Sequence, residues 1–158
     1  MHNKNLVLAL LLSLFTVFGA SAYTAAIGGE FALQSGDSLP SSALITFRLP
    51  TFPAVFGIGG TLRTDGGQGS LAIMADWWLA KGNLVSFVNY YVGPGAFAQF
   101  GSGGVNAGIR VPVGLDAFPI KPLELFVEVA PSFAIITPTA VNFGWSGFQT
   151  GFGFRFWF

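Results

Sequence analysis

The last eleven residues of the chain, 148–158, alternate between apolar side chains and small or polar ones. Successive side chains of a β-strand point to opposite faces, so this period of two predicts a strand with one apolar face and one small or polar face. The apolar face is predicted to carry Phe148, Phe152, Phe154, Phe156 and Phe158. The opposite face is predicted to carry Gln149, Gly151, Gly153, Arg155 and Trp157.

The same period recurs in earlier segments, where a charged residue, or Asn89 in the segment 84–92, sets the inward parity. An arginine on the lipid face at mid-depth would cost roughly 2 to 4 kcal/mol, so a charge there is expected to point inward. Eight segments follow this pattern: 27–33, 43–49, 56–63, 71–80, 84–92, 105–115, 123–133 and 148–158.

Composition decides where such strands can lie. Of the 158 residues, 52% are hydrophobic and only 9% are charged, which makes a water-exposed surface hard to build. Downstream of the N-terminus no stretch is long and apolar enough for a spanning helix, so strands are the membrane-spanning element. The expected fold is all-β, a transmembrane up-and-down antiparallel β-barrel of eight strands. Ten short strands remain open if residues 93–104 contain a further crossing.

Residues 1–22 read as a signal peptide and residues 23–158 as the transmembrane β-barrel. Lys4 gives the N-terminal region a positive charge, and the apolar run 6–18 that follows is short for a membrane span. Ala20 to Ala22 form a small-x-small cleavage site. The alternative is an anchoring helix.

An even number of strands places both chain ends on the periplasmic side and alternates tight turns with longer loops. The Pro, Gly, Asn and Asp residues predict periplasmic turns at 50–53, 81–83 and 116–122. The external loops are expected at 35–40, 64–69, 93–104 and 137–144.

Six charged residues are expected to form a charge network inside the barrel. Three are acidic and three are basic, and an eight-stranded lumen is only wide enough for side chains to fill it, so opposite charges should meet as ion pairs. Glu128 and Arg155, on adjacent strands, are the preferred pair. The alternative is a gate or a proton path. The six residues are Glu30, Arg63, Asp76, Arg110, Glu128 and Arg155.

Catalytic and nucleic-acid functions are not expected. The single histidine is His2, inside the signal peptide, and the chain has no cysteine, so neither a Ser-His-acid triad nor a thiolate or histidine metal site can form downstream. No cofactor is expected, and no basic run is present that could neutralise phosphates of a nucleic acid.

The C-terminal run Phe152, Phe154, Phe156 and Phe158 resembles the C-terminal signature of bacterial outer-membrane barrels. With the signal peptide and the eight segments, the chain resembles the small OmpA-like and OmpX-like barrels. The resemblance implies location in the outer membrane, contact with its lipids, and recognition of the four phenylalanines by the barrel-assembly machinery. The short external loops and the absence of a peptidoglycan-binding domain argue against adhesion and wall tethering.

Three functions remain open at this point. The favoured one is a structural or surface-interaction barrel with a side-chain-filled lumen, whose surface ligand, if any, the sequence does not name. The second is an OmpW-like narrow conduit for small hydrophobic molecules or ions, lined by Trp78, Phe87, Tyr91 and Phe126. The third is a lipid-modifying barrel enzyme, against which the missing histidine argues.

Overall fold

The structure is a computed structural model that describes residues 24–35, 41–62 and 69–158. The signal-peptide prediction, Arg63 and most of the external loops 35–40 and 64–69 therefore lie outside the described residues. Eleven strands form in the described part: β1 (Ala26–Ser35), β2 (Ser41–Arg48), β3 (Ala54–Leu62), β4 (Leu71–Trp77), β5 (Ala80–Val85), β6 (Val88–Val92), β7 (Gly95–Gly101), β8 (Gly104–Arg110), β9 (Val113–Ile120), β10 (Leu123–Ile136) and β11 (Val141–Trp157).

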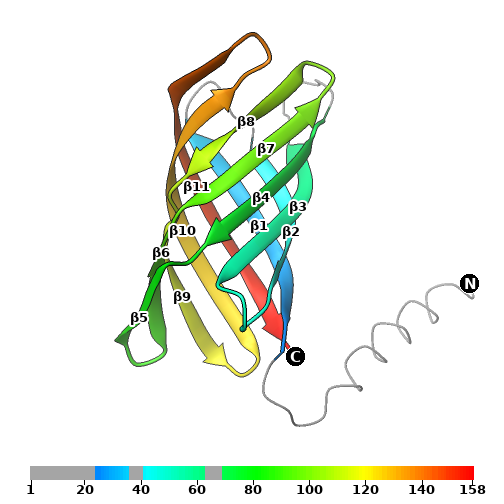
Figure 1. Cartoon of the computed structure of the whole chain (residues 1–158). Helices are drawn as coiled ribbons and strands as arrows, with labels where there is room; N and C mark the ends of the chain where they lie inside the picture. The colour runs from blue at the N-terminus through cyan, green and yellow to red at the C-terminus, as the bar shows by residue number, and fades with distance from the viewer. Residues whose placement is uncertain (1–23, 36–40, 63–68) are drawn as a thin grey trace, which may run out of the picture.

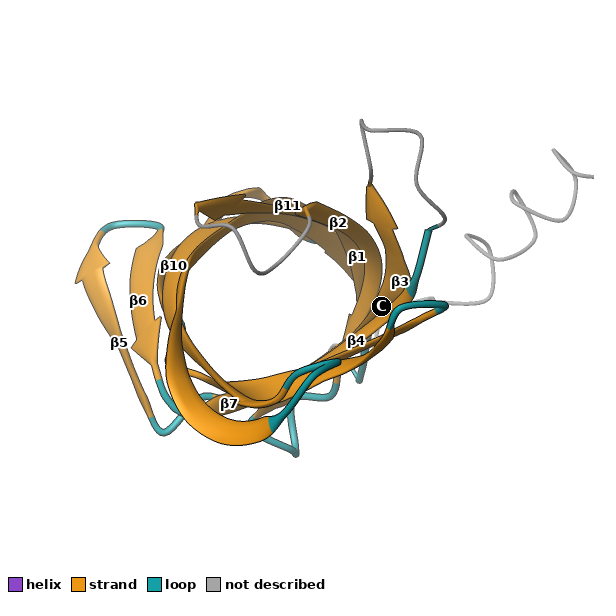
Figure 2. Ribbon diagram, turned by 90° about the horizontal axis from the view of Figure 1, so that it is seen from above, coloured by secondary structure: helices purple, strands orange, loops and turns teal. Residues whose placement is uncertain are grey.

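The strands close into an antiparallel barrel of eight crossings (Figures 1 and 2). β1 pairs with β11 from Ala26 opposite Trp157 to Ser35 opposite Phe148, and this pairing closes the ring. Three crossings are each interrupted once, so β4 and β5, β6 and β7, and β8 and β9 count as one crossing each. The predictions of an all-β barrel and of eight strands are confirmed.

Two of the three interruptions follow from residues that cannot continue the hydrogen-bond ladder. Gly93–Pro94 separates β6 from β7, and Val111–Pro112 separates β8 from β9. Proline has no backbone N–H, so it cannot donate within a sheet. The neighbouring groups still bond across the breaks, since the Gly93 N–H donates to the Pro112 carbonyl at 3.2 Å and the Val111 N–H donates to the Pro131 carbonyl at 3.0 Å.

The prediction of an external loop at 93–104 is wrong. Residues 95–101 form β7, which pairs with β4 and β8 and continues the crossing that β6 begins, so no further crossing is added. Its alternation is weak, because Phe97 and Gln99 are buried on the inner face while Ala96, Ala98 and Phe100 face outward. Each face of this strand therefore carries one phenylalanine, and neither face is clearly apolar.

Three other connections are shorter than predicted. Residues 81–83 belong to β5, and the hairpin turn lies at Ser86–Phe87. Asp116 belongs to β9, so the next turn is only Lys121–Pro122, and β11 begins at Val141, which leaves 137–140 as the connection from β10. The turn at 50–53 lies where it was predicted.

The barrel carries its large apolar side chains on the outer surface. Along β10 the exposed residues Leu125, Val127 and Val129 alternate with the buried Phe126 and Glu128. This is the inverse of a soluble barrel, whose outer face is polar. Within the described residues, no helix has the length and apolar character needed to cross a membrane.

The β5–β6 hairpin departs from the regular wall. Among the described strands β5 pairs only with β6, and almost every residue of β5 is exposed on both faces. Figure 2 shows the hairpin lying outside the ring formed by the other strands. Phe87, predicted to point into the lumen, is in the turn of this hairpin and is 55% exposed.

Candidate functional site in the barrel lumen

Arg110, at the end of β8, is the centre of the upper of two charge clusters inside the barrel. Upper here means the end of the barrel away from the C-terminus. Its guanidinium forms ion pairs with Asp76 on β4, at 3.2 Å, and with Glu128 on β10. It also donates to the Gln149 side-chain oxygen at 2.6 Å, and Glu128 accepts a second bond from the Tyr91 hydroxyl at 2.8 Å. All five side chains are buried, so this upper cluster links five strands across the lumen.

Glu30 lies beside the upper cluster without joining its hydrogen bonds. Both its carboxyl oxygens are buried and have no hydrogen-bond partner among the described residues, and the residue is 1% exposed. Gly151 makes room for it, because a Cβ at that position would lie 2.9 Å from a Glu30 oxygen and 3.0 Å from Glu128 Cγ. The upper cluster with Glu30 thus holds three carboxyl groups and one guanidinium.

Glu124 forms the centre of the lower cluster, near the C-terminal end of the barrel. Arg155 Nη1 donates to one carboxylate oxygen at 2.8 Å and Trp157 Nε1 donates to the other at 2.5 Å. Arg48 approaches the same carboxylate with Nη1 at 3.7 Å. Arg155 Nε also donates to the Thr46 hydroxyl at 3.3 Å. Two guanidinium groups therefore share one carboxylate.

The predicted pair of Glu128 with Arg155 is wrong. The register of β10 against β11 places Glu124 opposite Arg155 and Glu128 opposite Gly151. Directly opposed side chains are the ones within reach of each other in an antiparallel pair. Arg155 therefore binds Glu124, and Glu128 turns to Arg110.

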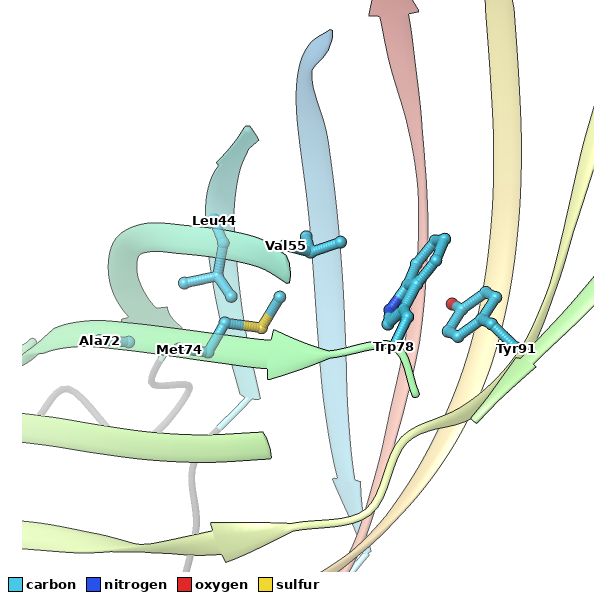
Figure 3. Packing of buried hydrophobic residues seen from close by; sticks show 6 residues of the cluster. All are labelled: Leu44, Val55, Ala72, Met74, Trp78 and Tyr91. Atoms are coloured by element: carbon cyan, nitrogen blue, oxygen red, sulfur yellow. The ribbon is translucent and has the colours of Figure 1, made fainter. Parts of the chain in front are cut away.

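Aromatic and apolar side chains occupy the space between the two clusters. Trp78 and Tyr91 stack with ring centroids 3.8 Å apart (Figure 3). The Arg48 guanidinium lies 3.9 Å from the Trp78 ring centroid. Gly114 faces Tyr91, and a Cβ there would overlap the phenol ring. Leu44, Val55, Ala72 and Met74 complete this buried group.

A small cavity remains above the upper cluster. Its volume is about 20 Å³, enough for a water molecule, and Arg110, Met74 and Gln149 are among the residues that line it. Ser42 and Gln99 supply further polar lining. The cavity therefore has a mixed polar and apolar lining and is too small for an organic ligand.

The structure places Glu30, Asp76, Arg110, Glu128 and Arg155 inside the barrel, and Arg63 lies outside the described residues. Three further buried charged residues were left out of the predicted network: Arg48, Asp116 and Glu124. Arg48 and Glu124 lie at inward-facing positions of the alternating pattern, so the sequence alone could have identified them as members of the network. Asp116, predicted to lie in a turn, belongs to β9 and accepts a 2.6 Å hydrogen bond from the Asn89 side chain on β6.

The four C-terminal phenylalanines lie on the other side of the wall. Phe152, Phe154 and Phe156 are exposed on the outer face of β11. Phe158 lies at the lower rim, where its carbonyl accepts bonds from the Thr24 and Ala25 N–H groups at 2.8 and 3.1 Å. The signature is therefore presented outward along the strand that closes the barrel.

The conduit lining predicted from the sequence is not assembled. Phe87 lies on the exposed hairpin, Trp78 and Tyr91 stack against each other, and Phe126 lies 3.8 Å from the Arg155 guanidinium. The described residues also contain no group of three or more acidic or histidine side chains placed to hold a metal ion. The chemistry that the lumen displays is ion pairing and hydrogen bonding.

Glu30→Gln is expected to leave the free energy of unfolding unchanged or to raise it, because the substitution removes a buried carboxyl group with no hydrogen-bond partner. Glu124→Gln should lower it, because two guanidinium groups then lose their common carboxylate. Urea unfolding monitored by tryptophan fluorescence compares the two variants. A loss of stability in Glu30→Gln equal to that in Glu124→Gln would show that Glu30 is an equally paired member of the network.

Comparisons with known proteins support the fold. No protein-family model matches the chain, and no curated protein matches it in sequence. The solved structure of Neisserial surface protein A (NspA) superposes with a TM-score of 0.51 at 15% sequence identity. The alignment covers 89% of this chain and 100% of that one. At this identity the likeness concerns the fold alone.

Proposed function

We propose that the chain is an integral outer-membrane β-barrel with a side-chain-filled lumen and a structural or surface-interaction role. The observation that carries the proposal is the pair of charge clusters, with the Trp78–Tyr91 stack between them, inside a barrel whose outer face is apolar. Side chains of this size leave little room for a pore in an eight-stranded barrel. The proposed role is non-enzymatic.

The outer face supports the membrane location. Leucine, isoleucine, valine and phenylalanine side chains are exposed on strands around the ring, and no soluble domain covers them within the described residues. A closed barrel satisfies its backbone hydrogen bonds internally, as a lipid environment requires. The fold shared with a neisserial surface protein supports the same location.

Aromatic side chains at the lower end fit a membrane interface. Phe52 contacts both Phe56, at 6.0 Å between centroids, and Trp77, at 4.5 Å, on the outside of the barrel. Rings of this kind gather at the headgroup level of membrane proteins. We place the termini on the periplasmic side and propose that the assembly machinery reads Phe152, Phe154, Phe156 and Phe158.

Single-channel recording in a planar bilayer tests the filled lumen. The refolded mature chain should insert and show negligible conductance, because the clusters and the aromatic stack block the cross-section. The double substitution Trp78→Ala and Tyr91→Ala removes the stack and should produce measurable conductance if the folded barrel persists on a heat-modifiability gel. Steady conductance by the unmodified chain would instead support the conduit hypothesis.

A further inference from the structure

We propose that the lower lumen binds an oxyanion, the phosphate group of a small molecule or of a lipid headgroup, between Arg48 and Lys81. Three hydrogen-bond donors lie close together here: the Arg48 guanidinium, the Lys81 ammonium and the Trp78 indole N–H. The Arg48 guanidinium lies 3.9 Å and the Lys81 ammonium 5.9 Å from the Trp78 ring centroid, and Trp78 carries its own indole N–H. No activity or ligand proposed above uses this site.

The buried donors at this site lack acceptors. Arg48 Nε and Nη1 and Trp78 Nε1 have no hydrogen-bond partner, although the two residues are only 7% and 5% exposed. A buried donor left unsatisfied costs about 1 to 3 kcal/mol, and more when it is charged. The hydrogen bonds that these donors could make are therefore not supplied by the described residues.

Glu124 does not accept a hydrogen bond from Arg48 or from Trp78. Its two oxygens accept from Arg155 at 2.8 Å and from Trp157 at 2.5 Å, whereas Arg48 comes no closer than the 3.7 Å ion-pair contact. Asp116 accepts from Asn89 with one carboxylate oxygen, and its other oxygen is buried and accepts a hydrogen bond from none of these donors. Counting Arg48, Lys81 and Arg155 against Asp116 and Glu124, the lower lumen keeps an excess of one positive charge.

The charge distribution along the lumen favours entry from the lower end. The upper cluster with Glu30 holds three carboxyl groups against Arg110, so it repels an anion, whereas the lower cluster is net positive. Lys81 lies on the exposed β5–β6 hairpin, which projects from the barrel at this end (Figure 1). A flexible ammonium at the mouth and a fixed guanidinium inside suit a phosphate oxyanion.

Binding of inorganic phosphate to the refolded chain in maltoside micelles, followed by ³¹P NMR, tests the site without requiring membrane insertion. We expect binding that weakens at least about tenfold, or about 1.4 kcal/mol, in Arg48→Gln and in Lys81→Gln. Lys121→Gln, which removes an exposed lysine from the turn at the same end, should bind as the unmodified chain does. Heat-modifiability shows that each variant is folded, and the exposed Lys81 can be changed without disturbing the interior.

A second arm identifies the source of the phosphate. Short-chain phosphatidic acid in the same micelles is compared with diacylglycerol of equal chain length, which has no phosphate. Binding of free phosphate indicates a small-molecule ligand, and binding of phosphatidic acid alone indicates a headgroup. Failure of both to bind, or equal binding by the unmodified chain and Lys81→Gln, would overturn the proposal.

Discussion

Replacing Arg110 by methionine is expected to lower the free energy of unfolding by about 3 to 5 kcal/mol, the usual cost of leaving buried charges without their partner. Asp76 and Glu128 would both lose their ion pair, and Gln149 would lose its donor. Urea unfolding in lipid vesicles, followed by tryptophan fluorescence, measures the loss.

A triple variant distinguishes the loss of charge pairing from the loss of packing as the cause of this destabilisation. The triple substitution Arg110→Met, Asp76→Asn and Glu128→Gln removes the cation together with the two carboxylates, so it should recover more than half of the lost stability. Lys121→Met, in an exposed turn, should change little. A loss of less than about 1 kcal/mol in Arg110→Met would mean that the upper cluster behaves like a solvated surface pair.

Val127→Arg is expected to destabilise the lipid-inserted barrel by roughly 2 to 4 kcal/mol, the cost of an arginine at the bilayer midplane. Val127 lies on the outer face of β10, 47% exposed, opposite Leu115 on β9 and Phe152 on β11. Folding into vesicles, measured from the heat-modifiable band on a gel, reports the effect.

Thr51→Arg provides the matched control, because Thr51 lies in the turn between β2 and β3 at the lower end. It should fold into vesicles as the unmodified chain does. Equal behaviour of Val127→Arg and Thr51→Arg would show that the outer face of β10 contacts water, and the membrane location would then be wrong.

The sequence predicts the barrel because its faces follow from local parity. A charged residue in the middle of a strand fixes the direction of every neighbour, so Arg110 and Glu128 determine the faces of their strands without knowledge of any partner. The pairing between side chains needs the register of one strand against the next. Glu124 and Glu128 have the same parity on β10, and only the register shows that Arg155 meets Glu124.

Two parts of the wall could not be predicted for a different reason. β7 buries Phe97 and faces alanines outward, and the preceding Gly93–Pro94 resembles a loop, so neither its pattern nor its boundary indicates a strand. The β5–β6 hairpin leaves the ring because β3 begins at Ala54, opposite Trp77 on β4, so no residue of β3 remains to pair with β5. Such effects depend on strands distant in sequence.

Spin-label accessibility along β10 in lipid bilayers tests the central claim most directly. The chain has no cysteine, so single substitutions from Leu125→Cys to Ala130→Cys can each be labelled at one site. We predict a period of two, with labels at 125, 127 and 129 colliding with oxygen dissolved in the lipid and labels at 126, 128 and 130 shielded from both oxygen and aqueous relaxation agents. Outward labels that collide with the aqueous agent, or a helical period near 3.6, would contradict a membrane-spanning barrel with a filled lumen.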